Sequence, residues 1–422
     1  MINLLPHQEE ALELTKDYNK VAYYYDMGLG KTFMGSEKAM DLHSNILVVC
    51  QKSKVNDWFN HFVEYYNYRD TGMVARDLTD KEELEWFFKN IHNKVRVVGI
   101  INYDLIWRRP ELSKLSNFTL MLDESSLIQN DTSKRSKFIL KKLNPTNVIL
   151  LSGTPTGGKY ELLWSQMHLL GWNISKDLYY KTYVDVDTSN GYPVIVGYKN
   201  EERLKRKMRA YGCVFKKTEE VIDLPEQRFI NVKIDEIKEY KKFMKDGIVT
   251  INDKELIGDT TLTKLLYARM LCGGYNQAKL DALSDLIDST DDRLVIFYNF
   301  KDELEAIKTV IQDRPISEVN GSVKDLENYE NCSNSITLVQ YQAGAMGINL
   351  QKSNKIIYFS PTLSSELYEQ SKKRIHRIGQ VNKCLYYKLV SGIEWSIYNT
   401  LDTRKDYTDK LFEEELENDK LS

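Results

Sequence analysis

Several features that would decide the class of a protein at once are scarce or missing from these 422 residues. No apolar run approaches the ~18–20 residues of a membrane-spanning helix, so the sequence predicts no transmembrane segment. The five cysteines are scattered without C-x-x-C spacing, which disfavours a zinc site and favours a reducing compartment. The first residues show no basic stretch followed by an apolar one, so we expect no signal peptide. These absences predict a soluble intracellular protein.

The chain also lacks a large excess of charge of either sign. It has 58 lysines and arginines and 61 aspartates and glutamates, for a net charge of −3. This balance alone does not indicate a nucleic-acid binder. The distribution is uneven, because residues 401–422 hold eight acids against four bases, whereas residues 133–142 and 199–217 are rich in lysine and arginine. Such runs are typical of solvated helix faces, and an anionic polymer partner is the alternative.

Short apolar runs rich in β-branched residues alternate with amphipathic stretches along most of the chain. Runs of this length suit strands that are buried on both faces, as in parallel sheets covered by helices. This alternation of apolar runs and amphipathic stretches occurs in two parts of the chain, and it predicts an α/β fold with two parallel-sheet lobes. The predicted strands are residues 21–25, 46–50, 95–101, 118–122, 148–151, 294–298, 336–341 and 355–359.

This alternation is interrupted between residues 160 and 275, where helix-forming residues predominate and the second basic run lies. We interpret this region as a helical addition to the first lobe followed by a connection to the second. The predicted boundaries are an N-terminal lobe at 1–165, a helical insertion and inter-lobe connection at 166–278, a C-terminal lobe at 279–400 and an acidic helical tail at 401–422.

A glycine-rich segment, DMGLGKT at residues 26–32, directly follows the first predicted strand. Glycines let backbone N–H groups approach phosphate oxygens, and the following helix directs its positive N-terminus at them. Lys31 suits the β- and γ-phosphates, and the Thr32 hydroxyl suits Mg²⁺. Tyr25 stands where the full pattern has a further glycine, so an ordinary glycine turn before a helix is the alternative.

An acidic pair, Asp123 and Glu124, ends the strand at 118–122. Ligand sites lie at the carboxyl edge of parallel strands, where an unliganded acidic pair is costly. Asp123 suits the Mg²⁺ shell, and Glu124 suits the polarisation of the water that attacks a γ-phosphate. The alternative is an acidic strand-end cap without a ligand.

Two further groups of residues fit a nucleotide-hydrolysing enzyme. The hydroxyls of Ser152 and Thr154 follow another strand at the same predicted sheet edge. Near the C-terminus, Gln370, Arg374 and Arg377 are spaced four and three apart, which predicts one helix face. Arginines there suit the stabilisation of charge on a transferring phosphoryl group, and ordinary surface arginines are the alternative.

With these residues in place, the chain resembles the superfamily-two helicase-like ATPases, and among them the Swi/Snf-type DNA translocases. The resemblance runs from Leu5 to about Gln380. RIHRIGQ at 374–380 is specific for that branch, and DMGLGKT is similar to its phosphate loop. Further matches are LPHQ at 5–8, LSGTP at 151–155, FKKT at 215–218 with LP at 224–225, and AGAMGINL at 343–350.

The resemblance implies two tandem RecA-like lobes, with ATP and Mg²⁺ bound by the first. It assigns catalysis to Lys31, Glu124, Arg374 and Arg377. It assigns ATP binding to Gln8, which would contact adenine, and to Gly28, Leu29, Gly30, Lys31, Thr32 and Gly347. Thr32 and Asp123 would hold the metal, Ser152, Thr154 and Gln370 would couple the lobes, and Lys52, Ser53, Asn102 and Lys372 would contact DNA.

The chain departs from the family pattern at three places. Ser126 replaces the histidine of the D-E-x-H motif, the residue that usually contacts the segment after Ser152. Gly157 and Gly158 stand where polar residues are common, and residues 340–342 replace a serine- and threonine-rich segment. The chain is also compact beside large remodellers, which is typical of a minimal viral or bacterial motor.

The leading hypothesis is a DNA-stimulated ATPase that moves along double-stranded DNA, with ATP hydrolysed between the lobes. Single-stranded DNA is an alternative substrate, and a strand-separating or annealing helicase is an alternative in the same class. An ATP-switched clamp or loading adaptor without processive movement is the alternative from another class. We expect a replication, recombination or repair protein as partner, no membrane, and a cytoplasmic location in a bacterial or virus-infected cell.

Overall fold

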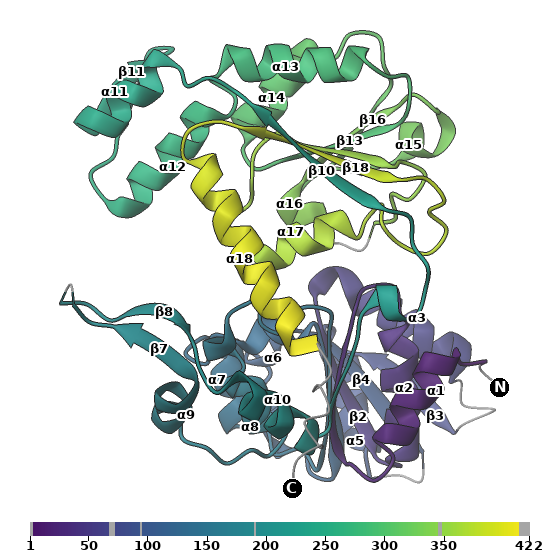
Figure 1. Ribbon diagram of the computed structural model, residues 1–422. Coiled ribbons are helices and arrows are strands. Elements are labelled where there is room, and N and C mark those ends of the chain that lie inside the picture. The colour runs from purple at the N-terminus through teal and green to yellow at the C-terminus, as the bar shows by residue number, and fades with distance from the viewer. Residues whose placement is uncertain (1–2, 67–71, 93–94, 190, 345–347, 413–422) are drawn as a thin grey trace, which may run out of the picture. The chain divides into compact units, whose positions relative to one another are not determined.

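Two sheets of seven strands, each covered by helices on both faces, organise the part of the chain that the computed structural model describes (Figure 1). The described residues are 3–66, 72–92, 95–189, 191–344 and 348–412. The chain divides into two compact units, with Met1–Val221 and Asp406–Ser422 in unit 1 and Ile222–Lys405 in unit 2. The predicted α/β class with two parallel-sheet lobes is confirmed.

The sheet of unit 1 is entirely parallel and has the order β3-β4-β2-β5-β6-β1-β9. Its strands are buried because each is a run of apolar residues between two helical layers. The strands are β1 (Lys20–Tyr25), β2 (Asn45–Cys50), β3 (Met73–Asp77), β4 (Arg96–Asn102), β5 (Phe118–Asp123), β6 (Asn147–Ser152) and β9 (Cys213–Lys216).

The helices of unit 1 alternate with these strands, and both faces of the sheet are covered. Tyr24 and Leu122 face a core cluster that contains Phe87, Ile139 and Met208 from three of the helices. The helices are α1 (Pro6–Leu14), α2 (Lys31–Asp41), α3 (Val55–Tyr65), α5 (Lys81–Asn90), α6 (Tyr103–Ile106), α7 (Lys134–Lys141), α8 (Trp164–Leu169), α9 (Lys176–Tyr183) and α10 (Glu201–Ala210).

The sheet of unit 2 has the order β10-β18-β17-β13-β16-β14-β15 and is parallel except for β15. One face packs on Leu283 and Ile307, and the other packs on Tyr368 and Tyr398. The strands are β10 (Gln227–Lys233), β13 (Leu294–Tyr298), β14 (Ile316–Val319), β15 (Lys324–Asp325), β16 (Ile336–Gln340), β17 (Lys355–Tyr358) and β18 (Cys384–Val390).

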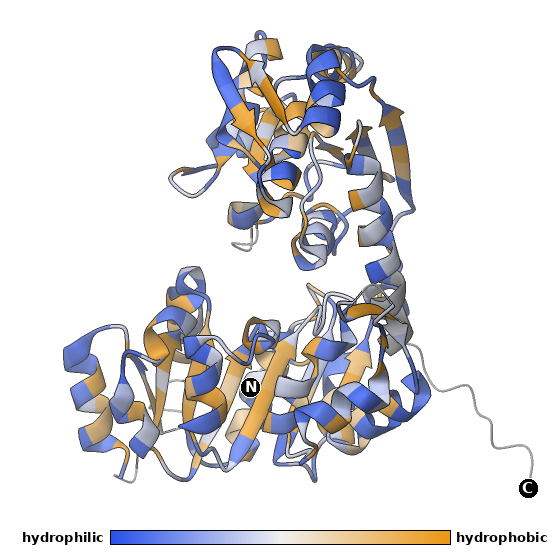
Figure 2. Cartoon of the chain, turned by 90° about the vertical axis from the view of Figure 1, so that its left-hand side faces the viewer, coloured by the Kyte–Doolittle hydropathy of each residue, from blue (hydrophilic) through white to orange (hydrophobic). Residues whose placement is uncertain are grey.

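Helices again fill the connections of unit 2, and the strands at the centre of each unit are the hydrophobic part of the chain (Figure 2). None of the helices in the described ranges has the length and apolar character needed to cross a membrane. The helices are α11 (Lys238–Asp246), α12 (Thr261–Cys272), α13 (Gln277–Asp288), α14 (Lys301–Val310), α15 (Glu327–Asn331), α16 (Tyr341–Gly344), α17 (Ser365–Lys372) and α18 (Glu394–Phe412).

The region expected to be a helical insertion, 166–278, differs from that expectation. It contains two antiparallel hairpins, β7 (Val184–Asp187) with β8 (Val194–Tyr198) and β11 (Ile248–Ile251) with β12 (Lys254–Ile257). Its strand β9 joins the sheet of unit 1, and β10 joins the sheet of unit 2. The boundaries between the compact units therefore fall at 221/222 and 405/406 rather than at 165 and 278. The last helix starts at Glu394, before the expected tail at 401.

Candidate functional site

The glycine-rich segment forms a tight loop between β1 and α2. Gly28 and Gly30 have φ values of +90° and +74°, which are left-handed conformations that glycine adopts without steric cost. Gly30 is the N-cap of α2, and a Cβ atom there would lie 2.0 Å from Nε2 of Gln8. The loop therefore requires glycine at this position for both its conformation and its packing.

Helix α1 holds the loop from one side. Its buried Gln8 donates from Nε2 to the carbonyl oxygens of Leu29 at 3.2 Å and Gly30 at 3.5 Å. Nε2 of His7 lies 3.0 Å from the same Leu29 oxygen. The structure places Gln8 against the phosphate loop, and its predicted contact with adenine stays a prediction.

The side chain of Lys31, at the first position of α2, turns back toward the end of β1. Its ammonium group donates to the carbonyl oxygens of Tyr25 at 2.7 Å and Asp26 at 3.0 Å. Nothing lies within 4 Å of the position that a Cβ on Gly28 would take, so there is open space in front of the loop. A cation, a helix N-terminus and free space together fit an anionic phosphate group.

The acidic pair lies at the carboxyl end of β5. Oδ2 of Asp123 accepts a hydrogen bond of 2.9 Å from the indole N–H of Trp58. Burial raises the pKa of Asp123, while the Trp58 hydrogen bond and the charge of Lys31 oppose that shift. Glu124 has a left-handed backbone, with φ +51° and ψ +61°, which is rare for a residue other than glycine. Strain of this kind is concentrated at functional sites.

Asp123 and Thr32 are the residues that fit the implied Mg²⁺ ion. A carboxylate and a hydroxyl are hard oxygen ligands, and Mg²⁺ at nucleotide sites completes its shell with water and phosphate oxygens rather than with a full protein cage. In the described ranges, no group of three or more His, Cys, Asp or Glu side chains is arranged to hold a metal ion by itself. The donor set thus fits a metal that arrives with a nucleotide.

The loop after β6 lies beside the phosphate loop, because Ser152 is the register partner of Tyr24 in β1. Ser152 is fully buried, and its hydroxyl accepts a 3.2 Å hydrogen bond from the N–H of Thr154. A Cβ on Gly153 would lie 3.6 Å from Nζ of Lys31. The structure therefore brings the predicted serine and threonine to the phosphate loop.

Trp58 and Gln166 are residues of this site that the sequence predictions did not include. The side chain of Gln166, in α8, is completely buried and contacts both the segment after Glu124 and the segment after Ser152. Its position in an otherwise ordinary amphipathic stretch offers no motif that sequence reasoning recognises.

Another part of the same sheet edge holds the predicted DNA contacts. Lys52 and Ser53, in a 3₁₀ turn (Lys52–Lys54) after β2, are exposed. Asn102 ends the neighbouring strand β4 and is only 3% exposed, and its Oδ1 accepts no hydrogen bond from the described residues. The structure brings these residues together, although Asn102 is more enclosed than a phosphate contact requires.

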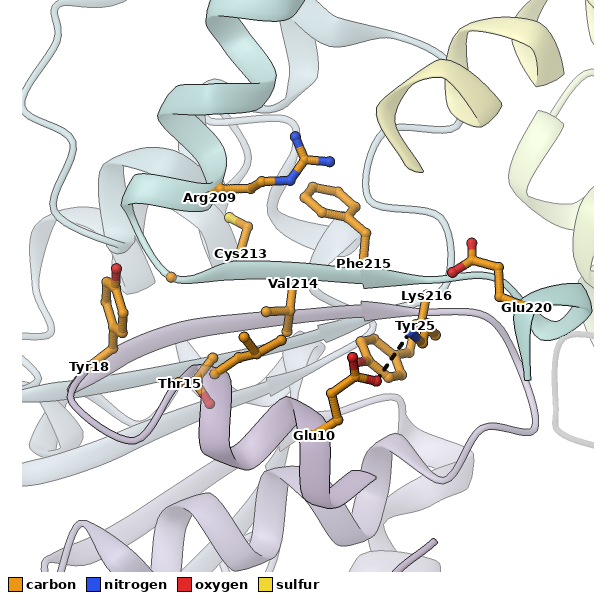
Figure 3. Close-up of a pocket in the computed structure, with 12 residues that line it drawn as sticks. Glu10, Thr15, Tyr18, Tyr25, Arg209, Cys213, Val214, Phe215, Lys216 and Glu220 are labelled. Carbon is orange, nitrogen blue, oxygen red and sulfur yellow. Dashed lines mark ion pairs between the residues drawn. The ribbon is translucent and has the colours of Figure 1, made fainter. Parts of the chain in front are cut away.

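A hollow of about 260 Å³ lies elsewhere in unit 1, between α1 and the edge strand β9 (Figure 3). An ion pair of 3.1 Å between Glu10 and Lys216 crosses one end of it. Its lining includes neither Lys31 nor the acidic pair. This hollow is therefore separate from the site built around the phosphate loop.

In unit 2, the arginine segment follows α17 instead of extending it. The expectation that Gln370, Arg374 and Arg377 share one helix face is wrong, because α17 ends at Lys372. Nη1 of Arg374 donates to the carbonyl oxygen of Ile348 at 3.4 Å, and Arg377 donates to Oδ1 of Asn349. Arg374 is only 2% exposed, whereas Arg377 is partly exposed.

Two other predicted residues of unit 2 are enclosed. Gln370 is buried and donates to Glu366 at 3.3 Å. Lys372 is buried as well, pairs with Glu369 and lies 4.8 Å from the ring centre of Tyr368. Its expected role in DNA contact is not favoured by this placement, because its charge is already satisfied inside unit 2. The predicted nucleotide contact of Gly347 lies outside the described residues.

Family models match both units. A SNF2-related domain matches residues 17–274, and the Helicase conserved C-terminal domain matches residues 278–379. This chain belongs to the SNF2-related family of helicase-like ATPases. The first match alone covers more than half of the chain, and it contains the phosphate loop, the acidic pair and Gln166.

The SNF2-related relatives share modest identity with this chain. SWI/SNF-related matrix-associated actin-dependent regulator of chromatin subfamily A member 1 of Mus musculus is 23% identical over 90% of this chain and 39% of its own length. The Probable global transactivator of Orgyia pseudotsugata multicapsid polyhedrosis virus is 21% identical over 97% of this chain and 92% of its own length. The solved Sulfolobus solfataricus SWI2/SNF2 ATPase core in complex with dsDNA has 20% identity and a TM-score of 0.47, over 97% of this chain and 92% of that one.

The chain spans only 33–39% of the length of the chromatin-remodelling relatives from Arabidopsis thaliana, Mus musculus and Saccharomyces cerevisiae.

Proposed function

We propose that the chain hydrolyses ATP and uses the energy to move along double-stranded DNA. The observation that carries this proposal is the hydrogen bond from Trp58 to Asp123. Trp58 lies in α3, which begins directly after the exposed Lys52–Lys54 turn. One short helix thus connects the proposed DNA contact with the carboxylate assigned to the metal, so DNA binding has a route to ATP hydrolysis.

The residues of unit 1 have separate tasks in this proposal. Lys31 and the first N–H groups of α2 would bind the β- and γ-phosphates, and Asp123 and Thr32 would hold Mg²⁺. The metal, when bound, neutralises charge on the phosphate oxygens. The carboxylate of Glu124 orients the attacking water and accepts its proton. From unit 2 we assign Arg377 to the charge that develops during phosphoryl transfer, and Arg374 to holding residues 348–350.

DNA would be bound mainly through its phosphates, with Lys52, Ser53 and Asn102 as contacts. The exposed bases of α10, Arg203, Arg206 and Lys207, are an auxiliary contact in this proposal. We place the protein in the cytoplasm of a bacterial or virus-infected cell, with support from the similarity to a viral relative over 92% of that relative's length.

The deciding experiment compares ATP turnover without nucleic acid, with single-stranded DNA, with duplex DNA and with RNA. We expect duplex DNA to stimulate most, and Lys31→Ala to abolish turnover in every condition. Displacement of a third strand from a triplex tests movement on the duplex. Strand displacement would favour a helicase, whereas ATP-dependent DNA binding without triplex displacement would favour a clamp. Stimulation by RNA alone would contradict the proposal.

A further inference from the structure

Gln166 makes three hydrogen bonds to three segments that surround the phosphate site. Its Oε1 accepts from the hydroxyl of Ser125 at 2.7 Å and from the hydroxyl of Tyr24 at 3.0 Å. Its Nε2 donates to the carbonyl oxygen of Pro155 at 2.6 Å. Tyr24, Ser125 and Gln166 are each 0% exposed, so water cannot replace these bonds.

The chemistry of the partners determines the orientation of the Gln166 amide. The Pro155 carbonyl can only accept, so the NH₂ group must face it. Burial raises the pKa of Tyr24 well above its ordinary value, which keeps its hydroxyl protonated as a donor. The amide oxygen therefore faces two hydroxyl donors, and all three bonds are satisfied at once.

The three hydrogen-bond partners of Gln166 lie in or next to segments to which we assign roles in ATP binding and hydrolysis. Ser125 directly follows Glu124, the residue with the left-handed backbone. Pro155 directly follows Thr154, and Tyr24 lies in the strand that leads into the phosphate loop. An anchored Ser125 opposes relaxation of the Glu124 backbone, and with it a change in where the Glu124 carboxylate points.

We propose that Gln166 is a positioning residue that couples the Asp123–Glu124 segment to the loop after Ser152. It provides within unit 1 a link between the two segments, which the family usually makes through the histidine that is Ser126 here. The inference rests on the proposed ATP hydrolysis. Gln166 acts on the orientation of Glu124, and its three hydrogen bonds go to Tyr24, Ser125 and Pro155, which lie outside the loop at residues 26–32.

The first test is Gln166→Leu, which keeps the volume and removes all three hydrogen bonds. We expect kcat for ATP to fall about tenfold or more, while KM for ATP stays within about twofold, because the loss affects water activation and spares phosphate binding. Ser165→Ala is the matched control on the same helix. Ser165 is equally buried, and its hydroxyl has no hydrogen-bond partner among the described residues, so kcat should be retained.

The second test is Gln166→Glu, which separates positioning from packing through its pH profile. A buried carboxyl group has a raised pKa, and in its neutral form it accepts from both hydroxyls and donates to the Pro155 oxygen. Once ionised, it repels that oxygen. The ratio of variant to wild-type kcat should therefore fall as pH rises, and it should approach one at the acidic end of the activity range.

The third test is a double-mutant cycle with Ser125→Ala. If Ser125 acts through Gln166, the double variant Ser125→Ala/Gln166→Leu should be no slower than Gln166→Leu alone. Effects that multiply would mean that the two residues act independently and would overturn the inference. If Gln166→Leu does not fold, the kcat of the single variant Ser125→Ala still tests whether the hydrogen bond between Ser125 and Gln166 matters for turnover.

The outcomes separate this inference from the proposed function. If wild-type protein shows no ATP turnover with or without any of the nucleic acids, the proposed function is wrong. Normal wild-type turnover together with wild-type kcat in a folded Gln166→Leu protein would overturn only the positioning role. So would a pH-independent ratio for Gln166→Glu.

Discussion

The indole N–H of Trp58 lies 2.9 Å from Oδ2 of Asp123 and donates a hydrogen bond to it. The bond favours the ionised form of a carboxyl group whose burial disfavours ionisation. It also occupies one carboxylate oxygen and so directs the other toward a ligand. Because Trp58 lies in the helix that follows Lys52 and Ser53, a shift of this helix on the proposed DNA binding would reach Asp123 directly.

Trp58→Phe should weaken metal binding while leaving the fold intact. The phenyl ring keeps most of the packing, but Asp123 loses its donor, so its neutral form becomes more favourable. We expect the Mg²⁺ concentration for half-maximal turnover to rise by about tenfold or more, in line with the loss of a partner that orients a metal ligand. Trp86→Phe is the control, since Trp86 packs under Arg76 in another part of unit 1. An unchanged Mg²⁺ dependence would contradict the assignment of Asp123.

Glu124→Gln should preserve ATP binding and stop hydrolysis. The amide keeps the shape of the side chain but cannot accept the proton of the attacking water, which costs on the order of 10²–10⁴ in rate. Binding of a fluorescent ATP analogue and steady-state turnover, measured on one preparation, check the prediction. Loss of binding would reassign Glu124 to the metal or to the structure of the loop.

The two arginines after α17 should behave differently from one another. Arg377→Ala should lower turnover by about 10³-fold with little change in Tm or ATP affinity, as expected for a residue on the transferring phosphoryl group. Arg377→Lys should restore little, because an ammonium lacks the forked donor geometry. Near-normal turnover in folded Arg377→Ala protein would remove Arg377 from catalysis.

Arg374→Ala should instead lower Tm, because the side chain is 2% exposed and holds the backbone at Ile348. Truncating such a buried, hydrogen-bonded side chain costs about 1–3 kcal/mol or more in the free energy of unfolding. Thermal melts of both arginine variants, compared with wild type, check this division of roles. A wild-type Tm for Arg374→Ala would contradict it.

Lys52→Ala should weaken duplex binding at low salt and reduce the dependence of affinity on salt. Each phosphate contact that is lost lowers the slope of log K against log[salt] by about one. Lys16→Ala removes another exposed lysine, which pairs with Glu13 on α1, and it should leave both quantities unchanged. Affinity titrations between low and physiological salt make the comparison, and equal slopes for both variants would exclude Lys52 as a phosphate contact.

The sequence was sufficient to predict those strands that can be recognised from a short local run of apolar residues. All eight predicted strands are present, because a buried parallel strand is recognisable as a short apolar run. Strands β9 and β10 were not predicted, since Cys213–Lys216 and Gln227–Lys233 mix basic and apolar residues, and their strand state depends on pairing with β1 and β18. Pairing partners of this kind are distant in sequence.

The candidate site likewise has residues that could be predicted from the sequence and residues that could not. The phosphate loop and the acidic pair follow from short motifs at strand ends, and the structure brings them to one sheet edge. Gln166 could not be predicted, because its role depends on three partners from distant segments. The burial of Lys372 was also missed, since a lysine beside an acid at helical spacing is usually solvated and only the surrounding aromatic rings enclose it here.

The last prediction concerns the pH dependence of stability in unit 2. Nζ of Lys279 lies 2.8 and 2.7 Å from the two carboxylate oxygens of Glu394, and both side chains are fully buried. Ser391 donates its backbone N–H to the same carboxylate at 3.0 Å. Burial raises the pKa of Glu394 from its ordinary 4.5 to about 7, against the lowering effect of Lys279.

Because the folded pKa of Glu394 lies above the unfolded one, the folded state binds more protons between pH 4.5 and about 7. The free energy of unfolding must then decrease with rising pH across this window, by up to about 3 kcal/mol from this group. Glu394→Gln cannot ionise, so it should lack this component. The unfolding midpoint of wild type relative to that of Glu394→Gln should therefore fall as pH rises from 4.5 to 8, and a constant difference would show that Glu394 does not titrate there.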